Sequence, residues 1–261
     1  MLGSTGALSQ ERNALHELVV IKTTLLKQLI RESPNRQITI GTAIHSIIDG
    51  VIMKQIYLTS SVEFVAASIG ERIGVTGKRL AFVSTAAEVV EGDLTWLKRG
   101  RNALVDTGFE VEDYTLTGKM SEEIEGDLLD FDVIFLSGGN NFYLMEKIQE
   151  SGCAPALREL VEGGKVYIGE SAGSTVASRN IYATYIEDDM KAAPNLQGFE
   201  GLGLVDFLVF PHWGSEYFRD RYIGRRMDHA YTSNDKIILL TDHQYVMVRG
   251  EMMRIIDVLK D

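Results

Sequence analysis

A serine between two glycines is the first feature of this sequence that could do chemistry. Residues 166–174 read Val-Tyr-Ile-Gly-Glu-Ser-Ala-Gly-Ser, so an apolar stretch runs into Gly-x-Ser-x-Gly around Ser171, and a helix-compatible stretch follows. Such a strand-to-helix turn lifts the serine oxygen above the edge of a sheet, where it can act as a nucleophile. The next backbone amide, that of Ala172, would then point at an oxyanion. The alternative is a plain glycine-rich turn that happens to contain a serine.

A second glycine-rich segment, residues 137–141, also follows an apolar stretch and reads Ser-Gly-Gly-Asn-Asn. Paired glycines let a backbone approach a ligand closely and leave its amides unblocked. If the two segments end neighbouring strands, their amides meet at one point and form an oxyanion hole. The alternative is a turn with a helix cap from Asn140 or Asn141. A phosphate-binding loop is excluded because no Gly-Lys-Ser/Thr follows at the required spacing.

A general base for Ser171 must come from elsewhere in the chain, and histidine serves most often. The chain contains five histidines: His16, His45, His212, His229 and His243. Only His212 ends an apolar stretch, in Val-Phe-Pro-His-Trp-Gly, so we expect it at a strand end beside the serine. His229 lies in a polar segment and is expected to be solvated, whereas His243 stays open as an alternative. No histidine spacing fits a metal site, so we predict no metal and no cofactor.

The elements that must position these residues alternate between two kinds. Stretches rich in β-branched residues predict strands over 54–59, 79–84, 109–115, 132–137 and 165–169. Longer stretches between them predict helices over 62–73, 93–105, 121–129, 141–150 and 154–161. Residues 133–136 are continuously apolar, as strands buried on both faces of a parallel sheet require. The alternation predicts an α/β fold with a mostly parallel central sheet.

The two ends of the chain follow other patterns. After the serine we expect a strand over 207–210, a polar helix over 215–231, and strands over 236–241, 244–249 and 252–257 that include a terminal hairpin at the sheet edge. Residues 1–52 contain an apolar helical stripe over 18–30 and nothing suited to chemistry. We therefore predict a catalytic domain over 53–261 and an N-terminal extension over 1–52, which is either a helical segment or a poorly ordered product of an over-long gene model.

The composition of the 261 residues excludes several function classes. The formal net charge is −11, which argues against a nucleic-acid or membrane partner because such binders cluster Lys and Arg. No apolar run approaches the roughly 18 residues of a membrane span, and no secretory signal opens the chain. The single cysteine, Cys153, cannot form an internal disulfide. We expect a cytoplasmic protein and leave a homodimer open.

Together these motifs resemble peptidase family S51, which comprises peptidase E, the cyanophycinases and bacterial relatives. The resemblance covers roughly residues 54–258. It rests on Ser-Gly-Gly-Asn-Asn-Phe at 137–142, Gly-Glu-Ser-Ala-Gly-Ser at 169–174, Gly-Leu-Gly-Leu-Val-Asp-Phe at 201–207 and Pro-His-Trp at 211–213. It implies a three-layer α/β/α fold of the class I glutamine amidotransferase-like (flavodoxin-like) type. It also implies Ser171 as nucleophile, His212 as base, and Gly139 with Ala172 as oxyanion donors.

The same resemblance leaves the third member of a catalytic triad open between two acids. It places an acid after a late strand, where this chain has Asp242 in place of the glutamate of peptidase E. That acid would hold the imidazole tautomer and stabilise the imidazolium. Asp189 matches a second acidic position, and is either the orienting acid or, like Asn140, a supporting or substrate-binding residue. For Asp189 the alternative is a solvated acidic loop.

Three residues bear on the substrate. Glu170 replaces the Trp or small residue usual in relatives, and a carboxylate beside the nucleophile would repel an acidic substrate. Arg221 and Arg225 share a helix face and could bind a free carboxylate; the alternative is a salt-bridged surface helix. We expect small peptides as substrates. Another small amide, ester or isopeptide, or a catalytically silent ligand-binding relative, are the alternatives, and glutamine hydrolysis is not expected because the turn holds Ser rather than Cys.

Overall fold

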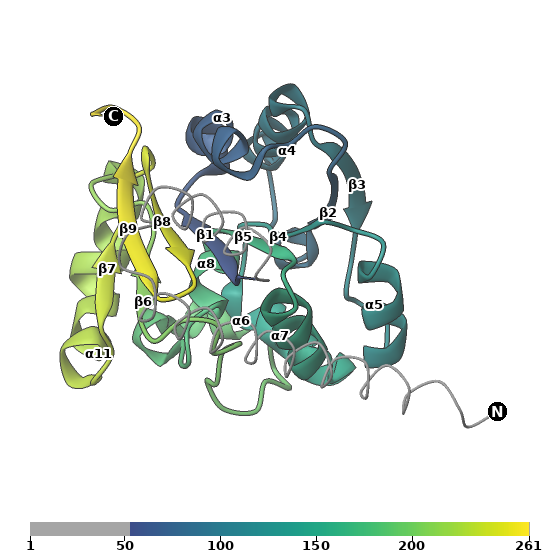
Figure 1. Ribbon diagram of the computed structural model, residues 1–261. Helices are drawn as coiled ribbons and strands as arrows, with labels where there is room; N and C mark the ends of the chain where they lie inside the picture. The colour runs from purple at the N-terminus through teal and green to yellow at the C-terminus, as the bar shows by residue number, and fades with distance from the viewer. Residues whose placement is uncertain (1–52, 261) are drawn as a thin grey trace, which may run out of the picture. The chain divides into compact units, whose positions relative to one another are not determined.

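Strands and helices alternate along the chain in the computed structural model, which describes residues 53–260 (Figure 1). The first strands are β1 (Gln55–Thr59), β2 (Arg79–Val83), β3 (Glu110–Tyr114), β4 (Val133–Leu136) and β5 (Val166–Glu170). The helices among them are α3 (Val62–Ile73), α4 (Thr95–Thr107), α5 (Ser121–Leu128), α6 (Asn141–Ser151), α7 (Ala154–Glu162) and α8 (Ala172–Val176). The strands and helices predicted up to β5 are confirmed, with ends shifted by one or two residues at most.

Seven of the described strands form one sheet in the order β3-β2-β4-β5-β1-β8-β9. The strands from β3 to β1 are parallel. The hairpin of β8 (Gln244–Arg249) and β9 (Met252–Asp257) joins β1 in antiparallel fashion, which confirms the predicted terminal hairpin. Because β4, β5 and β1 are parallel neighbours, their carboxyl ends meet at one edge of the sheet. Ligands of open α/β sheets bind at that edge.

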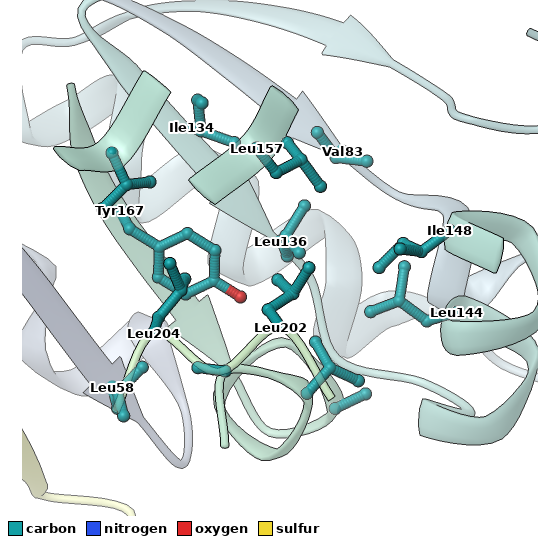
Figure 2. Packing of buried hydrophobic residues seen from close by; sticks show 14 of the residues in the cluster. Leu58, Val83, Ile134, Leu136, Leu144, Ile148, Leu157, Tyr167, Leu202 and Leu204 are labelled. Carbon is teal, nitrogen blue, oxygen red and sulfur yellow. The ribbon is translucent and has the colours of Figure 1, made fainter. Parts of the chain in front are cut away.

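Side chains along each strand alternate between two apolar clusters, one on each face of the sheet. In β5, Tyr167 belongs to the cluster that includes residues of α5 to α8, whereas Val166 and Ile168 belong to the cluster of α3 and α4. Figure 1 shows α3 and α4 together on one side of the sheet and α6 and α7 on the other. Figure 2 shows the Tyr167 ring packed with Leu202 and Leu204 in the first cluster. The predicted three-layer α/β/α fold is therefore confirmed.

The segment after α8 contains a strand pair outside the main sheet, and it differs from the prediction in the helix expected over 215–231. β7 (Ile237–Leu239) does not join the main sheet but pairs in parallel with β6 (Leu208–Phe210). A parallel pair needs a long crossover, and the helical segment between the two strands supplies it. That segment is not one helix: a 3-10 turn over 216–218, α10 (Arg219–Arg221), a π-helical turn over 222–226 and α11 (Met227–Thr232) follow one another. Gly224 weakens an α-helix here by about 1 kcal/mol relative to alanine.

Two predictions lie outside the described residues, namely the apolar helical stripe over 18–30 and the N-terminal extension over 1–52. Among the helices described between residues 53 and 260, none is both long enough and apolar enough to cross a membrane.

Candidate active site

Ser171 follows β5 directly and begins the turn into α8. Its backbone has φ 47° and ψ −101°, a conformation that costs a non-glycine residue roughly 1–3 kcal/mol. The Ser171 amide donates to the Thr59 carbonyl at the end of β1, at 2.9 Å. A Cβ on Gly169 would lie 2.6 Å from the Gly173 carbonyl oxygen, and a Cβ on Gly173 would lie 2.1 Å from the Leu136 oxygen. Gly-x-Ser-x-Gly is therefore a strained and crowded strand-to-helix turn rather than a plain glycine-rich loop.

His212 lies beside this serine, in the loop that follows β6. Its Nε2 is 3.0 Å from Ser171 Oγ, and its Nδ1 is 2.6 Å from Asp242 Oδ1. His212 has φ 59°, so it and Ser171 are the two non-glycine residues with positive φ among residues 53–260. Backbone strain of this kind concentrates at functional sites, where the surrounding structure holds it in place.

Two residues that the sequence analysis did not single out hold His212 in place. The His212 amide donates to Ser60 Oγ at 3.0 Å, and the Ser60 hydroxyl donates to the Leu240 carbonyl at 2.9 Å. The Phe218 ring stacks on the imidazole, with centroids 4.3 Å apart and planes tilted by 13°. Ser60 follows β1, so the meeting of strand ends at one sheet edge could have predicted it. Phe218 carries no such signal.

The two candidate acids occupy different places. Asp242 follows β7, and its carboxylate reaches the imidazole as described. Asp189, in α9 (Glu187–Met190), instead forms an ion pair with Arg221, and its Oδ2 lies 3.9 Å from Arg226 Nη2. The acid in hydrogen-bond contact with His212 is therefore Asp242, whereas Asp189 forms an ion pair with Arg221.

The glycine-rich loop after β4 lies against the serine turn. A Cβ on Gly138 would be 3.4 Å from Ser171 Cβ. Gly139 has φ 134°, and a Cβ there would lie 2.1 Å from the Ala86 carbonyl oxygen, so only glycine fits. Within residues 53–260, neither the Gly139 amide nor the Ala172 amide donates to a protein acceptor. The hydrogen-bonding capacity of both amides is therefore unused by the described part of the chain.

Asn140 has a structural part in this loop. Its Oδ1 accepts from the Phe142 and Tyr143 amides at 2.9 and 3.0 Å and so caps α6. Its Nδ2 donates to the Asp189 carbonyl at 2.7 Å, which ties the loop to α9. The helix cap that the sequence offered as an alternative is thus confirmed for Asn140.

Arg221 and Arg225 reach across to α9. Arg221 pairs with Asp189, and Arg225 Nη1 lies 3.5 Å from Asp188 Oδ2. Asp188 and Asp189 are therefore not a simply solvated acidic loop. The neighbouring Arg226 is 7% exposed, and its Nε is without a hydrogen-bond partner in the part of the chain that the structure describes. A substrate carboxylate would have to compete with these aspartates for Arg221 and Arg225.

The expectation that Glu170 faces an incoming substrate is wrong. The residue is 4% exposed, and its carboxylate lies against the first turn of α3 and beside Gly100 of α4. Side chains alternate along a strand, so Glu170 points to the same face as Val166 and Ile168. Its Oε1 accepts from the Val62 amide at 2.9 Å, and its Oε2 accepts from the Gly138 amide at 3.3 Å. Burial raises the pKa of Glu170, and these two amides and the nearby His212 counter the rise.

Two further histidines and the cysteine make their contacts with other residues than Ser171. His229, which was expected to be solvated, is half-buried: its ring packs edge-on against Tyr182 and Tyr185, with centroids 5.2 and 5.3 Å away. The His243 ring packs against the Phe64 ring, with the ring centroids 4.6 Å apart. Cys153 is buried in the apolar core, where burial raises the pKa of its thiol. Within residues 53–260, no group of three or more His, Cys, Asp or Glu side chains is placed to hold a metal ion.

Comparison with known proteins places the chain in a family. The model of peptidase family S51 matches residues 56–256. An uncharacterised peptidase of Listeria monocytogenes serovar 1/2a is 32% identical over 200 residues, which cover 76% of this chain and 96% of that one. Peptidase E of Streptomyces coelicolor is 35% identical over 180 residues, 67% of this chain and 70% of that one.

A solved structure agrees with this result. It is the crystal structure of a protein from Listeria monocytogenes EGD-e that is assigned as a peptidase E. It superposes with a TM-score of 0.71 at 30% identity, and covers 78% of this chain and 98% of its own. The family model spans the sheet from β1 to β9 and contains the serine turn and the histidine loop. The chain therefore belongs to peptidase family S51 and is a serine-type peptidase.

Proposed function

We propose that the chain hydrolyses small peptides through a Ser-His-Asp triad and an acyl-enzyme, with Ser171 as nucleophile. The observation that carries the proposal is the unbroken line of contacts from Ser171 Oγ through both imidazole nitrogens of His212 to Asp242. His212 takes the proton of Ser171 as the hydroxyl attacks the scissile carbonyl. It then returns the proton to the leaving amine. Asp242 holds the Nδ1–H tautomer and stabilises the imidazolium that forms.

Two amides are suited to the charge that develops on the carbonyl oxygen. We assign the oxyanion hole to Gly139 and Ala172, because their amides have no protein acceptor among the described residues. They come from the ends of adjacent strands β4 and β5. Each good donor of this kind is worth roughly 3 kcal/mol in the transition state. The glycine at 139 is required there because no side chain fits.

The substrate class rests on a relative and on charge. One matched relative, from Drosophila melanogaster, is named a probable alpha-aspartyl dipeptidase, and this name supports a short peptide as the substrate. Because the Glu170 carboxylate is buried behind the turn, it gives no reason to exclude acidic residues next to the scissile bond. Arg221 and Arg225, which pair with Asp189 and Asp188 of α9, would bind the free carboxylate of a short peptide in exchange for these ion pairs.

Turnover of a dipeptide library tests the proposal. The wild type, Ser171→Ala and the control Ser178→Ala would be incubated with dipeptides that include Asp-Xaa members, and free amino acids would be measured. Ser178 is a buried serine whose hydroxyl donates to the Thr175 carbonyl at 2.8 Å, so it controls for the loss of a hydrogen-bonded serine hydroxyl. We expect cleavage by the wild type and Ser178→Ala alone. Equal cleavage by Ser171→Ala would contradict the mechanism, and no cleavage by any of the three would contradict the dipeptide substrate in favour of other small amides, esters or isopeptides.

A further inference from the structure

Glu170, the residue before the serine, carries a buried carboxylate that the proposed mechanism does not use. Within residues 53–260 it forms no ion pair with Lys, Arg or His. Its partners are two backbone amides, Val62 at the first turn of α3 and Gly138 in the glycine-rich loop. A buried carboxylate without a cation is costly, and apolar residues would fill the same space at less cost. The two amides that this carboxylate binds therefore indicate a specific structural role for Glu170 beside Ser171.

One peptide group in the glycine-rich loop forms hydrogen bonds through both its carbonyl oxygen and its amide nitrogen to residues around Ser171. The Ser137 carbonyl accepts from the Gly173 amide at 3.2 Å, and the Gly138 amide of the same peptide donates to Glu170. Gly173 lies two residues after Ser171, and Glu170 lies one residue before it. A planar peptide held at its oxygen and at its nitrogen cannot rotate about its flanking bonds.

The orientation of that peptide helps to set where the next amide points, together with the Ser137 hydroxyl, which donates to the Gly138 carbonyl at 3.0 Å. Gly138 and Gly139 have no Cβ and would otherwise sample many backbone conformations. The far side of Gly139 is fixed, because the Asn140 amide donates to the Ala86 carbonyl at 2.8 Å. With both sides fixed, the Gly139 N–H has one direction relative to the Ala172 N–H.

We propose that Glu170 is a positioning residue that aligns the Gly139 amide with the Ala172 amide by holding the Ser137–Gly138 peptide. This inference rests on the proposed oxyanion hole. The task requires two acceptors on one side chain, since Oε1 serves α3 and Oε2 serves the loop. A glutamine fills the same volume but offers one oxygen, so its NH₂ group would face one of the two amides and push it away. The longer contact, at 3.3 Å to Gly138, is the one expected to open.

The kinetic test compares Glu170→Gln with the wild type and with Glu146→Gln. Glu146, in α6, is a buried carboxylate as well; its Oε2 accepts from the Asn195 amide and its Oε1 lies 3.3 Å from Lys147 Nζ. A full oxyanion donor is worth ~10²–10³ in kcat, so a misdirected one should lower kcat by about 10- to 100-fold with KM within about threefold. Glu146→Gln should keep kcat within about twofold of the wild type, although its melting temperature should shift about as much as that of Glu170→Gln. Glu170→Asp, whose shorter side chain cannot reach both amides, provides a second variant if Glu170→Gln folds poorly.

A second readout does not depend on activity. The sequence contains two Ser-Gly pairs, so labelling with carbonyl-¹³C serine and ¹⁵N glycine leaves the amides of Gly138 and Gly152 alone in a carbonyl-filtered spectrum. Gly152 ends α6, where its amide donates to the Gln149 carbonyl at 3.1 Å, and serves as the internal reference. Glu170→Gln should shift the Gly138 signal and speed its hydrogen exchange, while the Gly152 signal stays in place.

The two readouts separate this inference from the proposed function. A moved Gly138 signal together with a lower kcat supports the positioning role. An unmoved Gly138 signal, or an unchanged kcat in both Glu170 variants, overturns it. If the wild type shows no turnover at all, the proposed function fails. The rate at which a fluorophosphonate phosphonylates Ser171 is then measured in place of kcat. The same fold-change is expected for the Glu170 variants, and an unchanged rate in both variants overturns the positioning role.

Discussion

Replacement of Asp242 by asparagine tests the assignment of the third triad member. Asp242→Asn keeps the size of the side chain, and the distance of 2.6 Å between Nδ1 and Oδ1 leaves room for one hydrogen bond only. If the amide oxygen takes that bond, the tautomer survives but the negative charge beside the imidazolium is lost. If the amide NH₂ turns toward Nδ1, the proton of His212 moves to Nε2, and Ser171 loses its base.

Both outcomes are costly. Unit charges about 4 Å apart interact by roughly 4 kcal/mol at an effective dielectric constant of 20, which is about a thousandfold in rate. The wrong tautomer costs about 10⁴-fold in serine proteases with this arrangement. Because the side chains of His212 and Asp242 are 16% and 31% exposed, water screens part of the charge. We therefore expect kcat to fall by about 10³- to 10⁴-fold, with little change in KM.

Asp189→Asn is the matched control, since it neutralises the other candidate acid. It breaks the ion pair with Arg221 and should act mainly on KM, with kcat within about tenfold of the wild type. Steady-state hydrolysis of the best dipeptide from the library gives both constants. The reasoning is refuted if Asp242→Asn keeps more than a tenth of wild-type kcat, or if Asp189→Asn loses as much kcat as Asp242→Asn.

Three further predictions follow from the structure. Gly139→Ala places a Cβ 2.1 Å from the Ala86 oxygen at φ 134°. In a urea titration it should lower the free energy of unfolding by ~1–3 kcal/mol, and it should lower kcat by about 100-fold. The control Gly126→Ala, in open space on α5, should leave the free energy of unfolding unchanged or raise it in the same titration. Tyr222→Phe removes the hydroxyl that donates to the Pro211 carbonyl beside His212. It should lower the free energy of unfolding by about 1–2 kcal/mol and kcat by less than tenfold. A loss of kcat above tenfold would contradict this expectation. Burial raises the pKa of Glu170 above 4.5, so the folded chain keeps this proton to higher pH than the unfolded chain, and stability is lost as pH rises through the folded pKa. The unfolding free energy of the wild type minus that of Glu170→Gln should therefore decrease as the pH rises above 4.5, and an increase would refute the direction of the shift.

Local patterns were sufficient to predict the elements that carry the site. Alternation and apolar runs predicted α3, β8 and β9 with the bounds the structure gives, because each pattern lies within a few residues. The order of the serine turn and the histidine loop pointed to Ser171 and His212, and strand ends gather at one edge of a parallel sheet. The face to which Glu170 points was also readable, since residues 166, 168 and 170 share one side of β5.

Contacts between distant segments were not predictable from such patterns. Arg221 and Asp189 are 32 residues apart, and the rule of helical neighbours considers only partners on the same helix. The pairing of β7 with β6 rather than with the main sheet depends on the path of the crossover between them. The stacking of Phe218 on His212 depends on the 3-10 turn that breaks the expected helix.

The most direct test of the account is to find the residue that a fluorophosphonate probe labels. Such a probe forms a bond to an activated serine oxygen with loss of fluoride, which needs the nucleophile, its base and the oxyanion donors together. Intact-mass measurement and peptide mapping would locate the adduct. The account predicts one adduct per chain, on Ser171, and none on Ser171→Ala. Labelling at another residue, or equal labelling of the wild type and Ser171→Ala, would contradict it.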